Sequence, residues 1–256
     1  MGAERERLET SDDAVLGGRL VLRQPRRGHR VGHDAILLAA ATNARAGQHA
    51  VDVGAGVGAA GLALATRVGG LNVTLVDIDA ALCELAAGNA QRNGLGDRVR
   101  AATLDVTATD AFAAAGLHAA SADRVLMNPP FNDPSHVSPD AGRRLAYTAA
   151  PDTLPRWIEA ADYLLKPAGL LTLIWRADGR EAMLAALKPV FGNIVMLPVH
   201  PREDAPPIRI LLRAGKGGSA APRTLPGLAL NDPQGRPTTA AEAVLRGGAT
   251  LALAEM

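Results

Sequence analysis

The sequence predicts an α/β fold in which a doubly wound, seven-stranded, mostly parallel sheet forms the core. From residue 49 onward, short apolar segments alternate with longer helical stretches, a pattern typical of repeated βα units. The length of 256 residues and the apolar share of 48% are compatible with a single domain that carries additions. We therefore expect one open, Rossmann-like sheet with an antiparallel edge and an N-terminal hairpin and helix extension.

The expected elements of this sheet follow one another in chain order. Its strands lie at residues 50–53, 72–78, 99–106, 124–127, 170–175, 194–199 and 208–213. Helices are expected between them, ending near residues 68 and 93, and at residues 153–165 and 178–188. Leu154, Trp157 and Ile158 recur at helical spacing, so one face of their helix should pack on the sheet. The last two strands lack an intervening long helix and should pair antiparallel at one edge.

The N-terminal part is expected to add a small unit to this domain. Residues 1–13 are predicted to be a disordered tail, residues 14–48 a hairpin and helix extension, and residues 49–256 the main domain. The hairpin is expected to pair residues 19–24 with residues 29–31 across a Pro-Arg-Arg-Gly turn, ahead of a helix at 34–43.

The C-terminal part is predicted from its turn residues. The stretch 216–237 is rich in Gly and Pro and should form a loop. Residues 238–246 should then form a terminal helix.

Composition excludes several functional classes. Cys83 is the single cysteine, and the six histidines lack metal-ligand spacing, so neither a disulfide framework nor a metal site is expected. The charged N-terminus and the short apolar runs predict a cytoplasmic protein without a membrane anchor. The formal net charge of +1 provides no global field for nucleic acid, so such a partner must meet a local basic patch.

A glycine-rich turn follows the first strand of the main domain, in the run DVGAGVG at residues 52–58. Ligands of open α/β sheets bind outside the carboxyl ends of the strands, where glycines permit a close approach. A dinucleotide motif can be placed on Gly56, Gly58 and Gly61, but that register begins beyond the strand end and leaves Asp52 without a role. A carboxylate at Asp52 can order the turn and meet a ligand ammonium group, which favours S-adenosylmethionine.

Acidic residues follow three consecutive strands. Asp77 could accept protons from both ribose hydroxyls and Asp105 could accept from the adenine amine, because a carboxylate offers two acceptor oxygens. The alternative is that these acids are helix caps and turn formers. Three such acids in a row favour a cofactor site. Its predicted members are Asp52, Gly54, Gly56, Asp77, Ile78, Asp105, Val106 and Asn128.

The most specific motif is Asn128-Pro129-Pro130-Phe131 at the end of the fourth strand. Two prolines stiffen the backbone and leave the Asn128 side-chain oxygen and the Pro129 carbonyl as fixed acceptors. Such a pair suits a planar amino group that attacks an electrophilic methyl group, and Phe131 could stack on the attached ring. A simple proline-rich turn is the alternative. Methyl transfer to a planar nitrogen would rest mainly on positioning.

With these motifs, the sequence resembles the class I S-adenosylmethionine-dependent methyltransferases, in particular the amino-methylating branch with an Asn-Pro-Pro-aromatic motif. More narrowly, the segments GGRLVLRQPRRGHRVGHDAILLAAA, VDVGAGVGAAGLALA, VDIDAALCELAAGNAQRNGL, MNPPF and HPREDAPPIRILLRAGKG are similar to the tRNA(Val) adenine-N6 methyltransferases. The resemblance implies that residues 49–256 are the methyltransferase domain. It also implies that a segment before the first strand closes over the methionine part of the cofactor, with Arg30 and Asp34 near its carboxylate and amine.

The resemblance implies structured RNA, most simply tRNA, as the partner. Two groups of basic residues could hold its backbone, since arginine suits bidentate phosphate contact. They are Arg19, Arg23, Arg26, Arg27 and Arg30, and Arg202, Arg209, Arg213, Lys216 and Arg223. A solvated arginine-rich surface is the alternative.

Three functional hypotheses follow. The first is methylation of adenine N6 in RNA, and the second is methylation of a protein glutamine amide or a guanine amine, because the same acceptors would hold any planar NH2 group. The third is a scaffold that binds the cofactor or RNA without catalysis.

Overall fold

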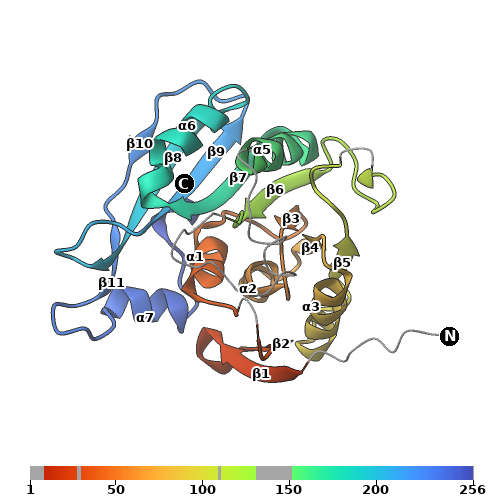
Figure 1. The fold of residues 1–256 in the computed structure, drawn as a ribbon, viewed down its shortest axis with the longest axis horizontal. Coiled ribbons are helices and arrows are strands. Elements are labelled where there is room, and N and C mark those ends of the chain that lie inside the picture. Colours follow the sequence, from red (N-terminus) through yellow and green to blue (C-terminus); the bar gives the residue numbers. More distant parts are fainter. Residues whose placement is uncertain (1–8, 28–29, 109–110, 131–151, 256) are drawn as a thin grey trace.

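The computed structural model describes residues 9–27, 30–108, 111–130 and 152–255. A central sheet runs through the molecule, with helices on both of its faces (Figure 1). In the described residues, no helix has the length and apolar character needed to cross a membrane.

The sheet contains the seven predicted strands. Their spatial order is β5 (Val99–Thr103), β4 (Asn72–Asp77), β3 (His49–Val53), β6 (Ala122–Met127), β7 (Leu165–Arg176), β9 (Arg209–Lys216) and β8 (Phe191–Arg202). The first five of these are parallel neighbours, whereas β9 is antiparallel to both β7 and β8. The predicted parallel sheet with an antiparallel edge is confirmed.

Two short strands add to this sheet where the sequence predicted only a loop. Within residues 216–237, β10 (Arg223–Thr224) and β11 (Leu228–Asn231) both pair parallel with β8. The prediction of a loop is wrong for these residues. Neither strand is long enough to show an apolar period, and both form because β8 offers them an open backbone edge.

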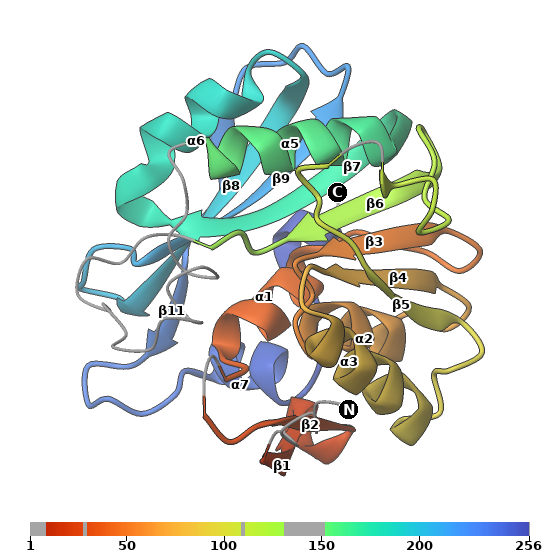
Figure 2. The same cartoon turned by 45° about the vertical axis from the view of Figure 1, so that its right-hand side comes forward.

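The helices divide between the two faces of the sheet (Figure 2). The helices α1 (His33–Ala41), α2 (Ala59–Arg67), α3 (Ala80–Arg92) and α7 (Thr239–Leu245) lie on one face, and α5 (Thr153–Leu164) and α6 (Arg180–Leu187) lie on the other. Ala50 belongs to the first core cluster, whereas Val51 and Val53 belong to the second. This alternation along β3 is what a strand buried on both faces requires.

The N-terminal hairpin forms with a different partner strand from the predicted one. The strand β2 (Leu20–Pro25) pairs antiparallel with β1 (Thr10–Val15) through the short turn Leu16–Gly18. Arg30 and Val31 form no strand, so the predicted return at residues 29–31 is wrong where it is described. The disordered tail expected over residues 1–13 is likewise wrong for residues 10–13.

The polar segment β1 forms a strand because of its pairing with β2. The β1 sequence TSDDAV is mostly polar and has no strand period of its own. It becomes a strand because β2 supplies backbone partners and Arg23, which pairs with Asp12 at 2.8 Å. The buried side chains of Leu20 and Leu22 fix the hairpin against α2 and α3.

Candidate active site

The carboxyl ends of β4, β3 and β6 bring three of the predicted site residues into one row. Val53 is in register with Val76 on one side and with Met127 on the other. The next residues along the chain are Asp77, Gly54 and Asn128. Strands β4 and β6 flank β3, so the chain order reverses here, which is where open α/β sheets bind ligands.

Asp52 is buried beneath the glycine turn and bonds to the start of α2. Its side chain is 2% exposed, and Oδ2 accepts a hydrogen bond of 2.7 Å from the backbone N–H of Gly61 in the first turn of α2. Burial raises the pKa of Asp52 to about 7, although the Gly61 N–H opposes this shift. Asp52 is thus bonded to the start of the helix that follows the glycine turn, and its predicted roles in ordering the turn and in meeting a ligand ammonium group stay predictions.

The glycine turn itself is held by two hydrogen bonds from the neighbouring strand β4. The N–H of Gly56 donates to Asp77 Oδ2 at 2.7 Å, and the N–H of Ala55 donates to the Val76 carbonyl at 2.8 Å. Gly56 has a φ of 56°, and a Cβ placed there would meet no atom within 4 Å. Glycine is therefore required here by backbone conformation, and the space beside it is open to a ligand.

Gly54 is required for a different reason. Its φ is 70°, and a Cβ at this position would lie 2.3 Å from Cη2 of Trp157 on α5. The indole ring therefore packs directly on the turn. Trp157 was expected in the core, and it does pack against the second core cluster while also supporting the site.

Asp77 and Ile78 occupy the end of β4. Asp77 Oδ1 accepts the N–H of Asp79 at 3.0 Å, and burial raises the pKa of the Asp77 carboxyl. Each carboxylate oxygen keeps a lone pair for a further donor. Ile78 is 66% exposed, so an apolar side chain is presented to solvent beside the acid.

Asp105 lies two residues beyond β5, because this strand ends at Thr103 and not at residue 106 as predicted. Its Oδ1 accepts the N–H and the hydroxyl of Thr107 at 2.9 and 2.7 Å. The Asp105 side chain is exposed and Val106 is buried. Asp105 is thus a turn former at the expected edge of the sheet, and its contact with adenine stays a prediction.

Asn128 follows β6 directly and is half-buried, and Pro129 behind it is buried. In the part of the chain that the structure describes, no protein group hydrogen-bonds to the Asn128 side-chain amide. The amide is therefore available to a ligand at the end of the row. Phe131 and the segment after it lie outside the described residues.

Comparison with known proteins identifies the family to which the chain belongs. Residues 29–198 match the model of the methyltransferase small domain family. The chain belongs to the methyltransferase small domain family. The predicted class I S-adenosylmethionine-dependent methyltransferase fold is thereby confirmed.

Individual proteins with similar sequences carry methyltransferase names. A tRNA1(Val) (adenine(37)-N6)-methyltransferase of Porphyromonas gingivalis is 35% identical over 153 residues, which are 58% of this chain and 59% of that protein. A protein of the same name from Parabacteroides distasonis is 28% identical over 196 residues, 76% of this chain and 80% of the relative. The chain therefore spans less than two thirds of the Porphyromonas relative.

A solved structure is similar to this chain over most of its fold. A protein from Agrobacterium tumefaciens, described as a predicted O-methyltransferase, has 27% sequence identity and a TM-score of 0.73. The match covers 85% of this chain and 98% of that one.

The residues at this edge of the sheet fit S-adenosylmethionine. Gly56 leaves open the space that a Cβ would fill, Asp77 offers acceptors for a ribose, and Ile78 offers an apolar surface for an adenine ring.

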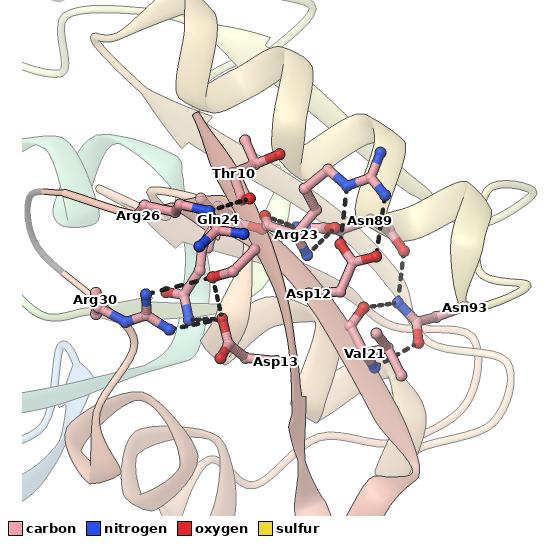
Figure 3. Close-up of polar contacts among 12 residues, drawn as sticks. Thr10, Asp12, Asp13, Val21, Arg23, Gln24, Arg26, Arg30, Asn89 and Asn93 are labelled. Carbon is pink, nitrogen blue, oxygen red and sulfur yellow. Dashed lines mark hydrogen bonds and ion pairs between the residues drawn. The ribbon is translucent and has the colours of Figure 1, made fainter. Parts of the chain in front are cut away.

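Arg30 and Asp34 both form ion pairs with other residues of the chain. The Arg30 guanidinium pairs with Asp13 at 2.8 Å, and Asp34 pairs with Arg209 of β9 at 2.9 Å (Figure 3 shows Arg30). Because Arg209 is opposite Arg176 at the end of β7, Asp34 does lie at the carboxyl edge of the sheet. The expected contacts of Arg30 and Asp34 with the cofactor stay predictions.

Sequence reasoning missed Asn89, which contacts the glycine turn from α3. Its Nδ2 donates to the Val57 carbonyl at 3.0 Å. An asparagine in the middle of a helix is unfavourable by propensity, and that local conflict was the available signal.

Proposed function

We propose that this chain is an S-adenosylmethionine-dependent N-methyltransferase acting on an exocyclic amino group, namely adenine N6 in tRNA. The observation that carries the proposal is the position of Asn128-Pro129-Pro130 beside the glycine turn, set by the pairing of Val53 with Met127. The printed names of the Porphyromonas and Parabacteroides relatives support tRNA as the acceptor. The proposal places the reaction in the cytoplasm and the methyltransferase domain at residues 49–256.

The residues of the row have separate tasks in this proposal. S-adenosylmethionine, when bound, supplies a methyl group on a sulfonium, which is a good leaving group. Asp77 would hold the ribose hydroxyls, Ile78 would cover one face of the adenine, and Asp52 would meet the ammonium group. Because the sulfonium is already reactive, positioning of the amine provides most of the acceleration.

Asn128 and Pro129 position that amine. The Asn128 side-chain oxygen and the Pro129 carbonyl each accept one N–H, which turns the nitrogen lone pair toward the methyl group. Neither proline has an N–H that could compete for the lone pair. Phe131 would stack on the base, a role that rests on the sequence alone.

The test compares nucleosides after reaction with the full chain. Purified protein is incubated with methyl-labelled S-adenosylmethionine and total tRNA, and the digested nucleosides are analysed by mass spectrometry. We expect N6-methyladenosine to rise. The Asn128→Ala variant should lose about 100-fold or more in turnover while its cofactor affinity stays within about threefold, because the lost contact serves the acceptor.

Asn72→Ala is the matched control, since Asn72 is exposed at the opposite edge of the sheet and should leave turnover unchanged. If the labelled methyl group were found in a polypeptide or in guanosine, the result would favour the second hypothesis, methylation of a glutamine amide or a guanine amine. Methylation of a ribose or hydroxyl group would contradict the N-methyltransferase assignment. Full activity of Asn128→Ala would remove the proposed role of the motif.

A further inference from the structure

Asn89 in α3 and Asn93, which caps the C-terminal end of α3, hydrogen-bond to the free backbone edge of β2 (Figure 3). Asn89 Oδ1 accepts the Arg23 N–H at 2.7 Å, and Asn89 Nδ2 donates to the Arg23 carbonyl at 3.0 Å. Asn93 makes the same pair of bonds to Val21, at 2.9 and 2.8 Å. Residues four apart on a helix share a face, as residues two apart on a strand share an edge. The outer edge of β2 is therefore docked on α3.

Asn89 has a further contact that Asn93 does not share. The second N–H of its amide donates to the carbonyl of Val57, in the glycine turn between Gly56 and Gly58. Asn89 is 0% exposed, and both of its amide protons are used. A buried amide satisfied in this way resists displacement, because any lost bond leaves a buried polar group without a partner.

The glycine turn is thus held from opposite sides. Asp77 fixes it at Gly56 from β4, and Asn89 fixes it at Val57 from α3. One side chain therefore joins the turn proposed to hold the cofactor with the docked edge of the hairpin. A shift of Val57 on ligand binding changes the geometry of an amide that also holds Arg23.

The hairpin carries charged groups that face outward. Arg23 is 43% exposed and pairs with Asp12, and the Arg26 guanidinium donates to the Thr10 carbonyl at 3.0 Å. The hairpin is packed on the main domain through Leu20 and Leu22, which are fully buried. It is therefore a separate surface that is connected to the glycine turn through α3.

We propose that Asn89 is a positioning residue that couples cofactor binding at the glycine turn to the docking of the β1–β2 hairpin. This inference rests on the proposed cofactor site. Linkage makes the coupling reciprocal. The bound cofactor stabilises the docked hairpin, and the docked hairpin raises the affinity for the cofactor. An acceptor that contacts the hairpin therefore binds more tightly to the loaded enzyme.

The test compares Asn89→Ala with Asn93→Ala, each of which removes an amide that holds one residue of β2. Asn93 is half-buried and its Nδ2 also donates to the Asn89 carbonyl at 2.7 Å, so its variant is the control for a loosened hairpin. Calorimetry with S-adenosylhomocysteine should give a Kd that is about tenfold higher for Asn89→Ala and within about twofold of the parent for Asn93→Ala. In steady-state assays, Asn89→Ala should raise KM for S-adenosylmethionine with kcat within about twofold of the parent. A purely structural role would lower the stability of Asn89→Ala but leave its KM for S-adenosylmethionine unchanged at temperatures where the variant is folded.

Hydrogen exchange of the unmodified protein provides a second measurement that does not depend on a variant folding. Saturating S-adenosylhomocysteine should slow exchange of the β2 amides at least about fivefold in the parent and in Asn93→Ala, and not in Asn89→Ala. Unchanged β2 exchange in the parent would overturn the coupling, as would equal Kd values for the two variants. Absence of any heat with the parent would instead overturn the cofactor site itself.

Discussion

At the scale of single residues, buried carboxyls carry much of the chemistry of the site. The Asp52 carboxyl is buried behind the glycine turn, where desolvation outweighs the bond from Gly61 and raises its pKa to about 7. Over the range from about pH 4 to pH 7, the folded protein therefore holds a proton that the unfolded chain releases. The free energy of unfolding should fall as pH rises through this range.

Asp52→Asn should reduce this pH dependence, because an amide keeps the acceptor for Gly61 without titrating, and the part that remains is that of Asp77. At pH 8 the variant should be more stable than the parent, by an amount on the order of 1.4 kcal/mol per unit of pKa shift. Urea denaturation at pH 5 and pH 8 measures the difference. Equal pH slopes for the two proteins would contradict the assignment.

The same substitution should weaken binding of the cofactor even though it stabilises the fold. Loss of the carboxylate removes the partner proposed for the ammonium group, and a charge-assisted bond is worth about 1.5–3 kcal/mol. We expect Kd for S-adenosylmethionine to rise at least about tenfold, measured by calorimetry at pH 8. An unchanged Kd would show that Asp52 only orders the turn.

Asp77 and Asp79 provide a matched pair two residues apart. Asp77→Ala removes the proposed ribose acceptors and the Gly56 contact, so Kd for S-adenosylmethionine should rise about 100-fold. Asp79 caps α3 by accepting the N–H groups of Ala81 and Leu82. Asp79→Ala should therefore cost about 1 kcal/mol of stability and leave the affinity within about threefold. Similar affinity losses in both variants would argue against a ribose contact.

At the scale of elements, the site depends on the contact between α5 and the glycine turn. The apolar period of residues 153–165 correctly predicted α5 and its buried face. It did not predict that Trp157 would lie over Gly54, since period alone gives a face and no specific partner. The hairpin shows the same limit, because the polar β1 becomes a strand only where β2 is present to pair with it.

Gly54→Ala should destabilise the protein by about 2–4 kcal/mol, from a left-handed backbone and overpacking against Trp157. Gly47→Ala is the control, since its φ is 79° but no atom lies within 4 Å of a Cβ there. It should cost about 1 kcal/mol. Thermal unfolding of both variants measures the difference.

The double variant Gly54→Ala/Trp157→Leu tests the packing part of this cost. Because the smaller side chain relieves the contact, the two substitutions together should cost less than the sum of their separate effects. Additive costs would show that backbone strain alone explains the Gly54 variant.

At the scale of the whole molecule, arginine serves two distinct purposes. Arginine outnumbers lysine 24 to 3, and several guanidiniums bind main-chain carbonyls at helix ends. Arg98 binds the carbonyls of Ala65, Val68 and Leu71 beyond α2, and Arg67 binds those of Ala39 and Thr42 beyond α1. Such arginines satisfy the unpaired carbonyls of the last helical turn.

Arginines that bind main-chain carbonyls and exposed arginines proposed to contact RNA should respond differently to substitution. Arg98→Ala should lower stability by about 2–3 kcal/mol and leave tRNA affinity unchanged. Exposed Arg27→Ala should leave stability unchanged, lower tRNA affinity and reduce the salt slope of binding by about 1. Filter binding over a range of salt concentrations, with thermal unfolding, checks both. A salt slope that Arg27→Ala leaves unchanged would place the RNA elsewhere.

The sequence by itself determined the seven main strands, their division into a parallel part and an antiparallel edge, and the row of Gly54, Asp77 and Asn128. Apolar runs separated by helices can bury both faces only as a parallel sheet, and the carboxyl ends of parallel strands meet at one edge. The pairing partner of β2, the carbonyls that the arginines bind and the double contact of Asn89 were decided by tertiary structure alone. Each depends on groups far apart in the chain, and no local pattern records which of them will meet.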